Sequence, residues 1–305
     1  MVSLSDIRQV FRGAISLSEP LALYTAFRVG GPADYYLEPQ TKDDLVRLVN
    51  YFQGMSFPFI LLGHGDNILV SDEGYRGAVI STDPALSHVC MEGQRVYAGA
   101  GTAVARFVDF CVHRSLKGSE ALAGAPGTLG KLLGQDGSAF DGAIADFLLE
   151  VEVLSAGNLK RRTKKEAEHR HDASTVAPDI LIGAWFAFPT GDKEDLLRLR
   201  RERLVRWNAI QPVNIPNAGV MFKSPAGQHA AELIERAGMR GVSQGGAVVS
   251  MRHANLIVNA QRATAEDMLA LIQRVQHAVQ DKFGVSLEPE VKLLGFDQMI
   301  LREVA

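Results

Sequence analysis

Apolar residues recur at helical spacing in residues 41–52 (TKDDLVRLVNYF), which predicts an amphipathic helix there. Thr41 and Asp44 form an approximate capping box at its start. The apolar face consists of Leu45, Leu48, Val49 and Phe52. We therefore expect this helix to cover a sheet or a second helix with that face.

Short apolar runs bounded by glycine predict strands. Residues 57–62 form such a run and end at Gly63, which is typical of a buried strand followed by a tight loop. A predicted strand at 96–100 and a helix at 103–114 repeat this plan. Further strands are predicted at 151–154 and 185–188.

The second half of the chain is predicted to contain helices at 192–207, 230–237 and 264–283. Thr264 and Asp267 cap the last of these. Its apolar stripe, which we interpret as core packing, consists of Met268, Ile272, Val275, Val279 and Phe283. The alternation of strands and helices along the chain predicts an α+β or α/β fold.

Composition excludes several functional classes. The chain has 305 residues, 47% apolar and 22% charged, and a net charge of -3, which gives no general attraction to nucleic acid or anionic lipid. We interpret the basic runs at 160–165 and 198–206 as solvated surface. No apolar run approaches the ~18 residues of a membrane span, and the N-terminus lacks a signal-peptide core, so a soluble cytoplasmic protein is expected.

The two cysteines, Cys90 and Cys111, have no C-x-x-C or Cys/His ligand spacing around them. Idle thiols in a reducing compartment are the expected state. His169 and His171 lie close together, but no third ligand is evident, so no metal site is predicted.

Five glycine-rich or polar stretches, each different, follow one another along almost the whole chain. They include TAFRVGGPAD, GHGDNILVSDEGYRG, ALAGAPGTLGKLLGQDGSAFDG, QPVNIPNAGVMFKSP and GGAVVSMRHANLIVN followed by LEPEVKLLG. This series resembles the UDP-N-acetylenolpyruvoylglucosamine reductases of peptidoglycan synthesis. A single glycine-rich fragment would be weak support, but several in register identify the chain as a divergent member of that family.

The resemblance implies an α+β fold in three parts. Residues 1–85 and 86–195 would form two subdomains of an FAD-type (PCMH/VAO-like) binding fold, and 196–305 a C-terminal α+β substrate domain. In this family FAD is reduced by NADPH and passes a hydride to the enolpyruvyl double bond of a UDP-sugar. A serine protonates the neighbouring carbon, while an arginine and a glutamate stabilise the negative charge that develops.

The catalytic positions implied by the resemblance are only partly retained. Glu290 stands where the family has its catalytic glutamate. The arginine position is Asp172 and the serine position is Val220. Valine has no exchangeable proton, and loss of a general acid costs about 10²–10⁴-fold in rate. Whether the chain is an enzyme is therefore left open by its sequence.

The cofactor positions are altered as well. Flavin-contacting backbone is expected at Gly63, Gly65, Asn67, Gly127 and Gly130. Asp66 replaces the family's serine, and a carboxylate about 4 Å from a phosphate is repelled by about 4 kcal/mol at an effective dielectric constant of about 20. That repulsion corresponds to about three decades of affinity. Lys131 replaces the second glycine of a pair and adds bulk, although its charge would partly offset Asp66.

Three residues match the family's substrate side, namely Asn217, Lys223 and Asn255. The first hypothesis is an impaired or repurposed homologue with weakened or lost flavin binding, which binds a nucleotide-sugar or a protein partner. The second is an active FAD-dependent, NADPH-using reductase with a rearranged proton donor. The third is a flavin oxidoreductase with a changed substrate, in which His171 or another group handles the proton. Nucleic acid and membrane are not expected as partners.

Overall fold

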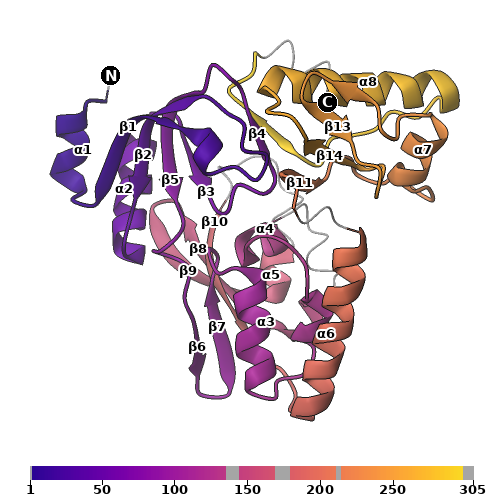
Figure 1. The fold of residues 1–305 in the computed structure, drawn as a ribbon. Coiled ribbons are helices and arrows are strands. Elements are labelled where there is room, and N and C mark those ends of the chain that lie inside the picture. Colours follow the sequence, from indigo (N-terminus) through magenta and orange to yellow (C-terminus); the bar gives the residue numbers. More distant parts are fainter. Residues whose placement is uncertain (1, 135–143, 169–178, 211–213, 298–305) are drawn as a thin grey trace. The chain divides into compact units, whose positions relative to one another are not determined.

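The computed structural model of the chain describes residues 2–134, 144–168, 179–210 and 214–297 (Figure 1). Its α-helices are α1 (Leu4–Val10), α2 (Lys42–Gly54), α3 (Val104–His113), α4 (Leu129–Gly134), α5 (Lys164–Glu168), α6 (Lys193–Ile210), α7 (Ala230–Arg236) and α8 (Ala265–Phe283). Short 3-10 turns are η1 (Leu21–Leu23), η2 (Ser119–Leu122) and η4 (Ala145–Phe147).

In the described part of the chain the strands form two antiparallel sheets, a short parallel pair and a four-stranded sheet in which β3 and β5 run parallel, which confirms the predicted α+β class. Within each sheet the strands are ordered β1-β2-β5-β3, β6-β7-β10-β8-β9, β11-β14-β13-β12 and β15-β4. Their bounds are β1 (Ala14–Pro20), β2 (Pro32–Glu38), β3 (Phe59–Leu62), β4 (Ile68–Val70), β5 (Tyr75–Ser81), β6 (Val89–Glu92), β7 (Arg95–Gly99), β8 (Leu148–Ser155), β9 (Asn158–Thr163), β10 (Ile180–Phe186), β11 (Asn217–Val220), β12 (Ser243–Gln244), β13 (Ala247–Val249), β14 (Leu256–Asn259) and β15 (Lys292–Leu294).

Contacts divide the chain into two compact units. Unit 1 comprises Met1–Ser16, Tyr36–Gly63 and Ala78–Trp207. Unit 2 comprises Leu17–Tyr35, His64–Gly77 and Asn208–Ala305. The division into 1–85, 86–195 and 196–305 stays a prediction.

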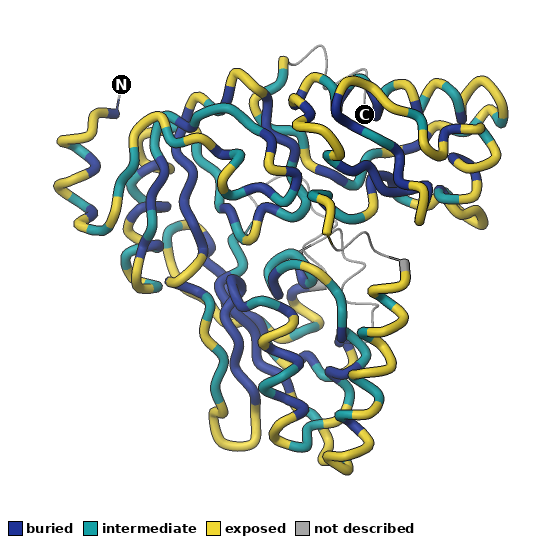
Figure 2. The backbone as a smooth tube through the Cα atoms, viewed as in Figure 1, coloured by how far each residue is buried: buried dark blue, intermediate teal, exposed yellow. Residues whose placement is uncertain are grey.

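Unit 1 has its main core on one face of the sheet β6-β7-β10-β8-β9, where α3 and α4 pack. Phe107 of α3 lies 5.1 Å from Phe186 of β10, centroid to centroid. Leu129 and Leu133 of α4 join the same buried cluster. The central strands of this sheet, β7, β8 and β10, are mostly buried and are dark blue in Figure 2, whereas β9 is mostly exposed.

The opposite face of that sheet carries a buried polar network. Glu152 of β8 is 8% exposed and accepts hydrogen bonds from the Tyr97 hydroxyl at 3.1 Å and the Lys42 ammonium at 3.0 Å. Because each of these buried polar groups has a partner, the network avoids the desolvation cost of an unpaired charge.

Unit 2 packs α7 and α8 with the sheet β11-β14-β13-β12 to form its core. The capping box of α8 is present, since the Asp267 N–H donates to Thr264 Oγ1 and the Thr264 N–H to Asp267 Oδ2. The predicted stripe is confirmed as core: Met268, Ile272, Val275 and Val279 are at most 1% exposed, and Phe283 packs partly buried against them.

The predicted helix at 41–52 is confirmed as α2. The Asp44 N–H donates to Thr41 Oγ1 at 3.1 Å. Its apolar face is fully buried, with zero exposure at Leu45, Leu48, Val49 and Phe52. The N-terminal cap and the apolar periodicity together were sufficient to predict this helix.

The strand expected at 185–188 is wrong in its bounds. β10 begins at Ile180, where it pairs with Leu154, and ends at Phe186. Gly183 lies inside this strand. A side chain is excluded at this position, because a Cβ would lie 2.4 Å from the Tyr97 hydroxyl oxygen. A glycine inside a strand often marks such a close approach of a neighbouring group.

Within the described ranges, no helix has both the length and the hydropathy to cross a membrane. The same residues contain no group of three or more His, Cys, Asp or Glu side chains that could hold a metal ion.

Candidate functional site

The segment around Val220 is held in a defined conformation by β11. Asn217 begins this strand, and its side chain donates to the Ile215 carbonyl at 2.8 Å and accepts from the Gly219 N–H at 3.2 Å. Gly219 has a φ of 77°, which glycine adopts without steric cost. The PNAG motif therefore builds a turn that presents the next residue, Val220.

Val220 is 44% exposed and lies outside the core of unit 2. It pairs with Leu256 of β14 through its backbone. Nothing in the packing of the unit requires an apolar side chain there. The packing of the unit therefore gives no reason for a valine at this position, and its correspondence to the family's serine stays a prediction.

Asn255 holds the backbone immediately after Val220. Its amide donates to the Phe222 carbonyl at 2.8 Å and accepts from the Phe222 N–H at 2.9 Å. Its own carbonyl accepts from the Met221 N–H at 2.9 Å. Asn255 is 5% exposed, so it positions this segment, and its contact with a substrate stays a prediction.

Glu290 lies on a segment that is hydrogen-bonded to the same loop. Its N–H donates to the Met221 carbonyl at 2.8 Å, and its carbonyl accepts from the Asn67 amide at 3.2 Å. The Lys292 N–H donates to the Asn67 carbonyl at 3.1 Å, next to the parallel pair of β15 and β4. Unit 2 thus brings three predicted motifs together: the glycine turn before Asn67, the PNAG segment and LEPEV.

Lys223 follows the same loop and is tied to the LEPEV segment. Its ammonium lies 2.7 Å from Glu288 Oε1, and its N–H donates to the Glu288 carbonyl at 2.9 Å. The two side chains are 36% and 61% exposed, so the ion pair itself adds little stability. Lys223 is nevertheless held on the same segment as the other predicted substrate residues.

The glycine turn at 63–67 is required by the chain's own packing. Gly65 has a φ of 63°, and a Cβ there would lie 2.0 Å from the Tyr24 carbonyl oxygen. The Ala26 N–H also donates to the Gly65 carbonyl at 2.9 Å. Asp66 is half-buried in this turn. The turn therefore keeps the glycine geometry of the motif while it carries a carboxylate.

The second glycine motif precedes α4 in unit 1. Gly127 has a φ of 93°, and the Gly130 N–H donates to the Ala100 carbonyl at 2.7 Å. A Cβ at Gly130 would lie 2.9 Å from that oxygen. The half-buried Lys131 donates its N–H to Thr128 Oγ1 at 3.3 Å. A Cβ at Gly63 would meet the Thr128 side chain at 3.2 Å, so the first glycine of the other motif packs on this turn.

Leu132 follows Lys131 and packs partly buried against the core of unit 1. The bulk of Leu132 is thus accommodated by clusters that include residues of α3 and of the sheet. Asp172, together with His169, Arg170 and His171, lies outside the described residues.

Both cysteines are free, and burial raises the pKa of their thiols. For Cys111, which is fully buried, the pKa rises to about 12. A thiol with so high a pKa is a poor nucleophile at neutral pH.

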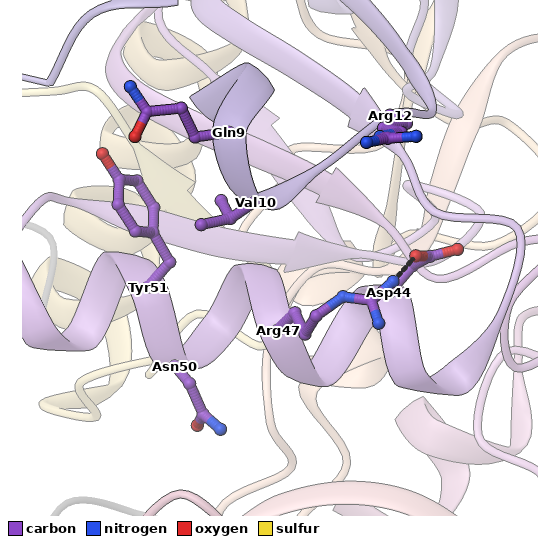
Figure 3. A pocket seen from close by; sticks show the side chains of 7 residues that line it. All are labelled: Gln9, Val10, Arg12, Asp44, Arg47, Asn50 and Tyr51. Carbon is purple, nitrogen blue, oxygen red and sulfur yellow. Dashed lines mark hydrogen bonds and ion pairs between the residues drawn. The ribbon is translucent and has the colours of Figure 1, made fainter. Parts of the chain in front are cut away.

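The described part of the chain includes two hollows that bear on the candidate site. The first has a volume of about 780 Å³ and lies between α1 and α2 of unit 1 (Figure 3). Its lining residues are Gln9, Val10, Arg12, Asp44, Arg47, Asn50 and Tyr51. None of the predicted site residues lines it, and Arg47 is paired there with Asp44.

The second hollow, of about 520 Å³, lies in unit 2 beside the PNAG segment. It is lined by Thr25, Ala26, Arg28, Asn214, Ile215, Pro216 and Asn217. Only Asn217 among these was predicted as a site residue. The TAFRVGGPAD motif was the available signal for the others, but it was used for the resemblance alone.

Comparison with known proteins decides the family. A family model described as UDP-N-acetylenolpyruvoylglucosamine reductase, C-terminal domain, matches residues 211–294, and one described as FAD binding domain matches 33–160. The chain is 38% identical to the UDP-N-acetylenolpyruvoylglucosamine reductase of Chloroherpeton thalassium, over 98% of this chain and 99% of that one. The chain belongs to the UDP-N-acetylenolpyruvoylglucosamine reductase family. The family assignment made from the motifs is thereby confirmed.

Further members of the reductase family are also similar to this chain. The enzyme of Geobacter sulfurreducens is 39% identical over 93% of this chain and 95% of its own length. The crystal structure of the reductase (MurB) from Thermus caldophilus matches with a TM-score of 0.73 and 29% identity, over 93% of this chain and 99% of that one. These matches extend the assignment to the fold of the whole chain.

The described residues fit a flavin only in part. Both glycine turns are tight, but packing within the chain already accounts for Gly65 and Gly130. A carboxylate does not suit a diphosphate, since like charges repel. If the turn at 63–67 faces the flavin diphosphate, as the resemblance implies, Asp66 does not fit the cofactor in charge.

Proposed function

We propose that this chain is a divergent member of the reductase family in which the reductase reaction is impaired or the fold has been repurposed. The observation that carries the proposal is Val220, which stands at the position of the family's proton-donating serine. A hydrocarbon side chain cannot supply the proton that the reaction requires. The loss of such a general acid costs about 10²–10⁴-fold in rate.

The hydrogen bonds that hold the backbone next to Val220 support this proposal. Asn255 bonds Phe222 at both backbone groups, and Glu290 bonds Met221, so the loop keeps its hydrogen bonds on both sides. A distorted loop would leave open which residue replaces the serine. Here the frame is ordered, and a residue without a hydroxyl occupies the position.

Weakened or lost flavin binding is a second part of the proposal. Asp66 adds a negative charge to a turn that is expected to face the flavin diphosphate. Repulsion of about 4 kcal/mol would lower affinity by about three decades. Lys131 would partly offset that charge, so we expect weakened binding at the least. Asp172, at the expected position of the catalytic arginine, belongs instead to the proposed impairment of the reaction.

The alternative is an active FAD-dependent reductase that uses NADPH and UDP-N-acetylglucosamine enolpyruvate. Bound flavin would supply the hydride. Glu290 favours this alternative, because it retains the family's carboxyl group on a segment bonded to the residue after Val220. A third candidate is a flavin oxidoreductase that acts on another substrate. It would use the same flavin as the active reductase but would not reduce the enolpyruvate.

The ligand we propose for unit 2 is a nucleotide-sugar. The relatives are named as reductases of UDP-N-acetylenolpyruvoylglucosamine, and the residues matching their substrate side are gathered in unit 2, including Asn217 and Lys223. A repurposed member could bind a protein partner instead.

The visible absorption spectrum of the purified chain, with and without added FAD, tests the flavin part. We expect a colourless protein that binds added FAD weakly or not at all. The same measurement on the Geobacter sulfurreducens reductase is the positive control. A stoichiometric bound-flavin spectrum would show that Asp66 and Lys131 are tolerated and would favour the active alternative.

A further inference from the structure

The loop that contains Arg28 is fixed from several directions within unit 2. Thr25 Oγ1 donates to the Val29 carbonyl at 2.7 Å and accepts from the Val29 N–H at 3.2 Å. The Asn259 amide donates to the Phe27 carbonyl at 2.9 Å. Phe27 and Val29 are buried in the core of the unit, at 0% and 4% exposure. Arg28 lies between these two buried residues and is exposed.

Arg28 adopts a backbone conformation that arginine disfavours. Its φ is 55°, in the left-handed region where glycine and asparagine are common and long side chains are rare. Such strain persists only where the surrounding structure imposes it, and it is concentrated at ligand-binding sites. A glycine would satisfy this backbone without strain, so the guanidinium itself calls for an explanation.

Arg28 lines the second hollow. Arg28 is the charged residue of its lining, and the polar side chain of Asn217 is already bonded to Ile215 and Gly219. Ile215 is 41% exposed and adds an apolar surface. A volume of about 520 Å³ lies within the range of small-molecule sites, about 300–1,000 Å³.

We propose that Arg28 binds an oxyanion group, phosphate or carboxylate, of a ligand in this hollow. Arginine presents a planar fork of donors that matches both groups with two parallel hydrogen bonds. The loop also reaches the glycine turn, because the Ala26 N–H donates to the Gly65 carbonyl. That the oxyanion belongs to a nucleotide-sugar rests on the proposed function, whereas the oxyanion chemistry of Arg28 does not.

The test is calorimetric titration of the full chain with inorganic pyrophosphate and, separately, with pyruvate. Arg28→Gly removes the guanidinium and suits the left-handed backbone, so it should fold. We expect at least a tenfold loss of affinity for the probe that the wild type binds. Arg28→Lys should retain part of the affinity, because it keeps the charge but not the fork.

Arg262→Gly is the matched control. Arg262 is also an exposed arginine of unit 2 with a positive φ, 53°, but it does not line the hollow. Its substitution should change neither affinity by more than twofold.

The probe that responds to Arg28→Gly distinguishes a phosphate site from a carboxylate site. The proposal is overturned if the wild type binds neither probe, or if Arg28→Gly binds as tightly as Arg262→Gly. These outcomes do not bear on the proposed loss of turnover, which is measured by NADPH oxidation.

Discussion

The end of β11 in unit 2 and helix α4 in unit 1 each carry a residue that departs from the motif implied by the resemblance, but in different surroundings. At the end of β11, Val220 is 44% exposed, and its neighbours are bonded on both sides. In α4, Leu132 packs partly buried against the unit's own core. Because only the side chain of Leu132 takes part in core packing, we expect the two positions to respond differently to substitution.

The largest effect is expected from restoring the family's residue in the glycine turn. Asp66→Ser removes the carboxylate that would repel the flavin diphosphate, and affinity for FAD should rise by up to about 1,000-fold. Fluorescence titration with FAD measures this. Asp281→Ser, which removes an exposed carboxylate of α8, should leave the affinity unchanged. An equal effect of the two variants would mean that Asp66 does not face the cofactor.

A larger loss of stability is expected from mutation of Asn255, which holds the backbone after Val220, than from mutation of Val220 itself. Asn255→Ala leaves the buried N–H and carbonyl of Phe222 without partners, at a cost of about 1–3 kcal/mol for each group. We expect about 2–4 kcal/mol loss in the free energy of unfolding, measured by urea denaturation. Asn208→Ala, at an exposed position of α6, is the control. A loss below 0.5 kcal/mol for Asn255→Ala would contradict the stabilising role of the two hydrogen bonds between Asn255 and Phe222.

Leu132→Ala tests whether the bulk near α4 has become part of the core. Because the side chain is partly buried, we expect a loss of about 1–3 kcal/mol, at or below the range for fully buried leucines. Leu159→Ala, at a residue of β9 that is 38% exposed, should cost much less. Equal costs would mean that Leu132 contributes no packing.

The smallest effect is expected from Val220→Ser. Since Val220 is exposed and outside the core, the free energy of unfolding should change by no more than about 0.5 kcal/mol. A loss above 2 kcal/mol, measured in the same urea series, would show that the valine has a packing role. The contrast between unit 2 and unit 1 would then disappear.

Local sequence signals predicted the elements that local physics determines. α2 and α8 follow from a cap and a periodic apolar face, and both were confirmed. β10 was predicted at 185–188 but runs from Ile180 to Phe186, because its pairing with β7 and β8 is not local in the sequence. The short α4 has too few residues for periodicity to be informative.

The candidate site was predictable only in its residue types. Asn255 was predicted as a substrate residue, but its bonds reach Phe222, 33 positions away in the sequence, and no local pattern encodes that contact. Arg28 was missed because a positive φ is anticipated at glycine and not at arginine. The motifs at 63–67, 217–223 and 287–290 contact one another in unit 2, whereas the roles of the residues within them stay predictions.

Substrate-dependent NADPH oxidation, measured with FAD and UDP-N-acetylglucosamine enolpyruvate at saturating concentrations, tests the central claim most directly. With the Geobacter sulfurreducens reductase assayed in parallel, we expect this chain to be slower by at least about 100-fold, because position 220 has no proton to give. A rate equal to that of the relative would contradict the account and establish that another group protonates the substrate.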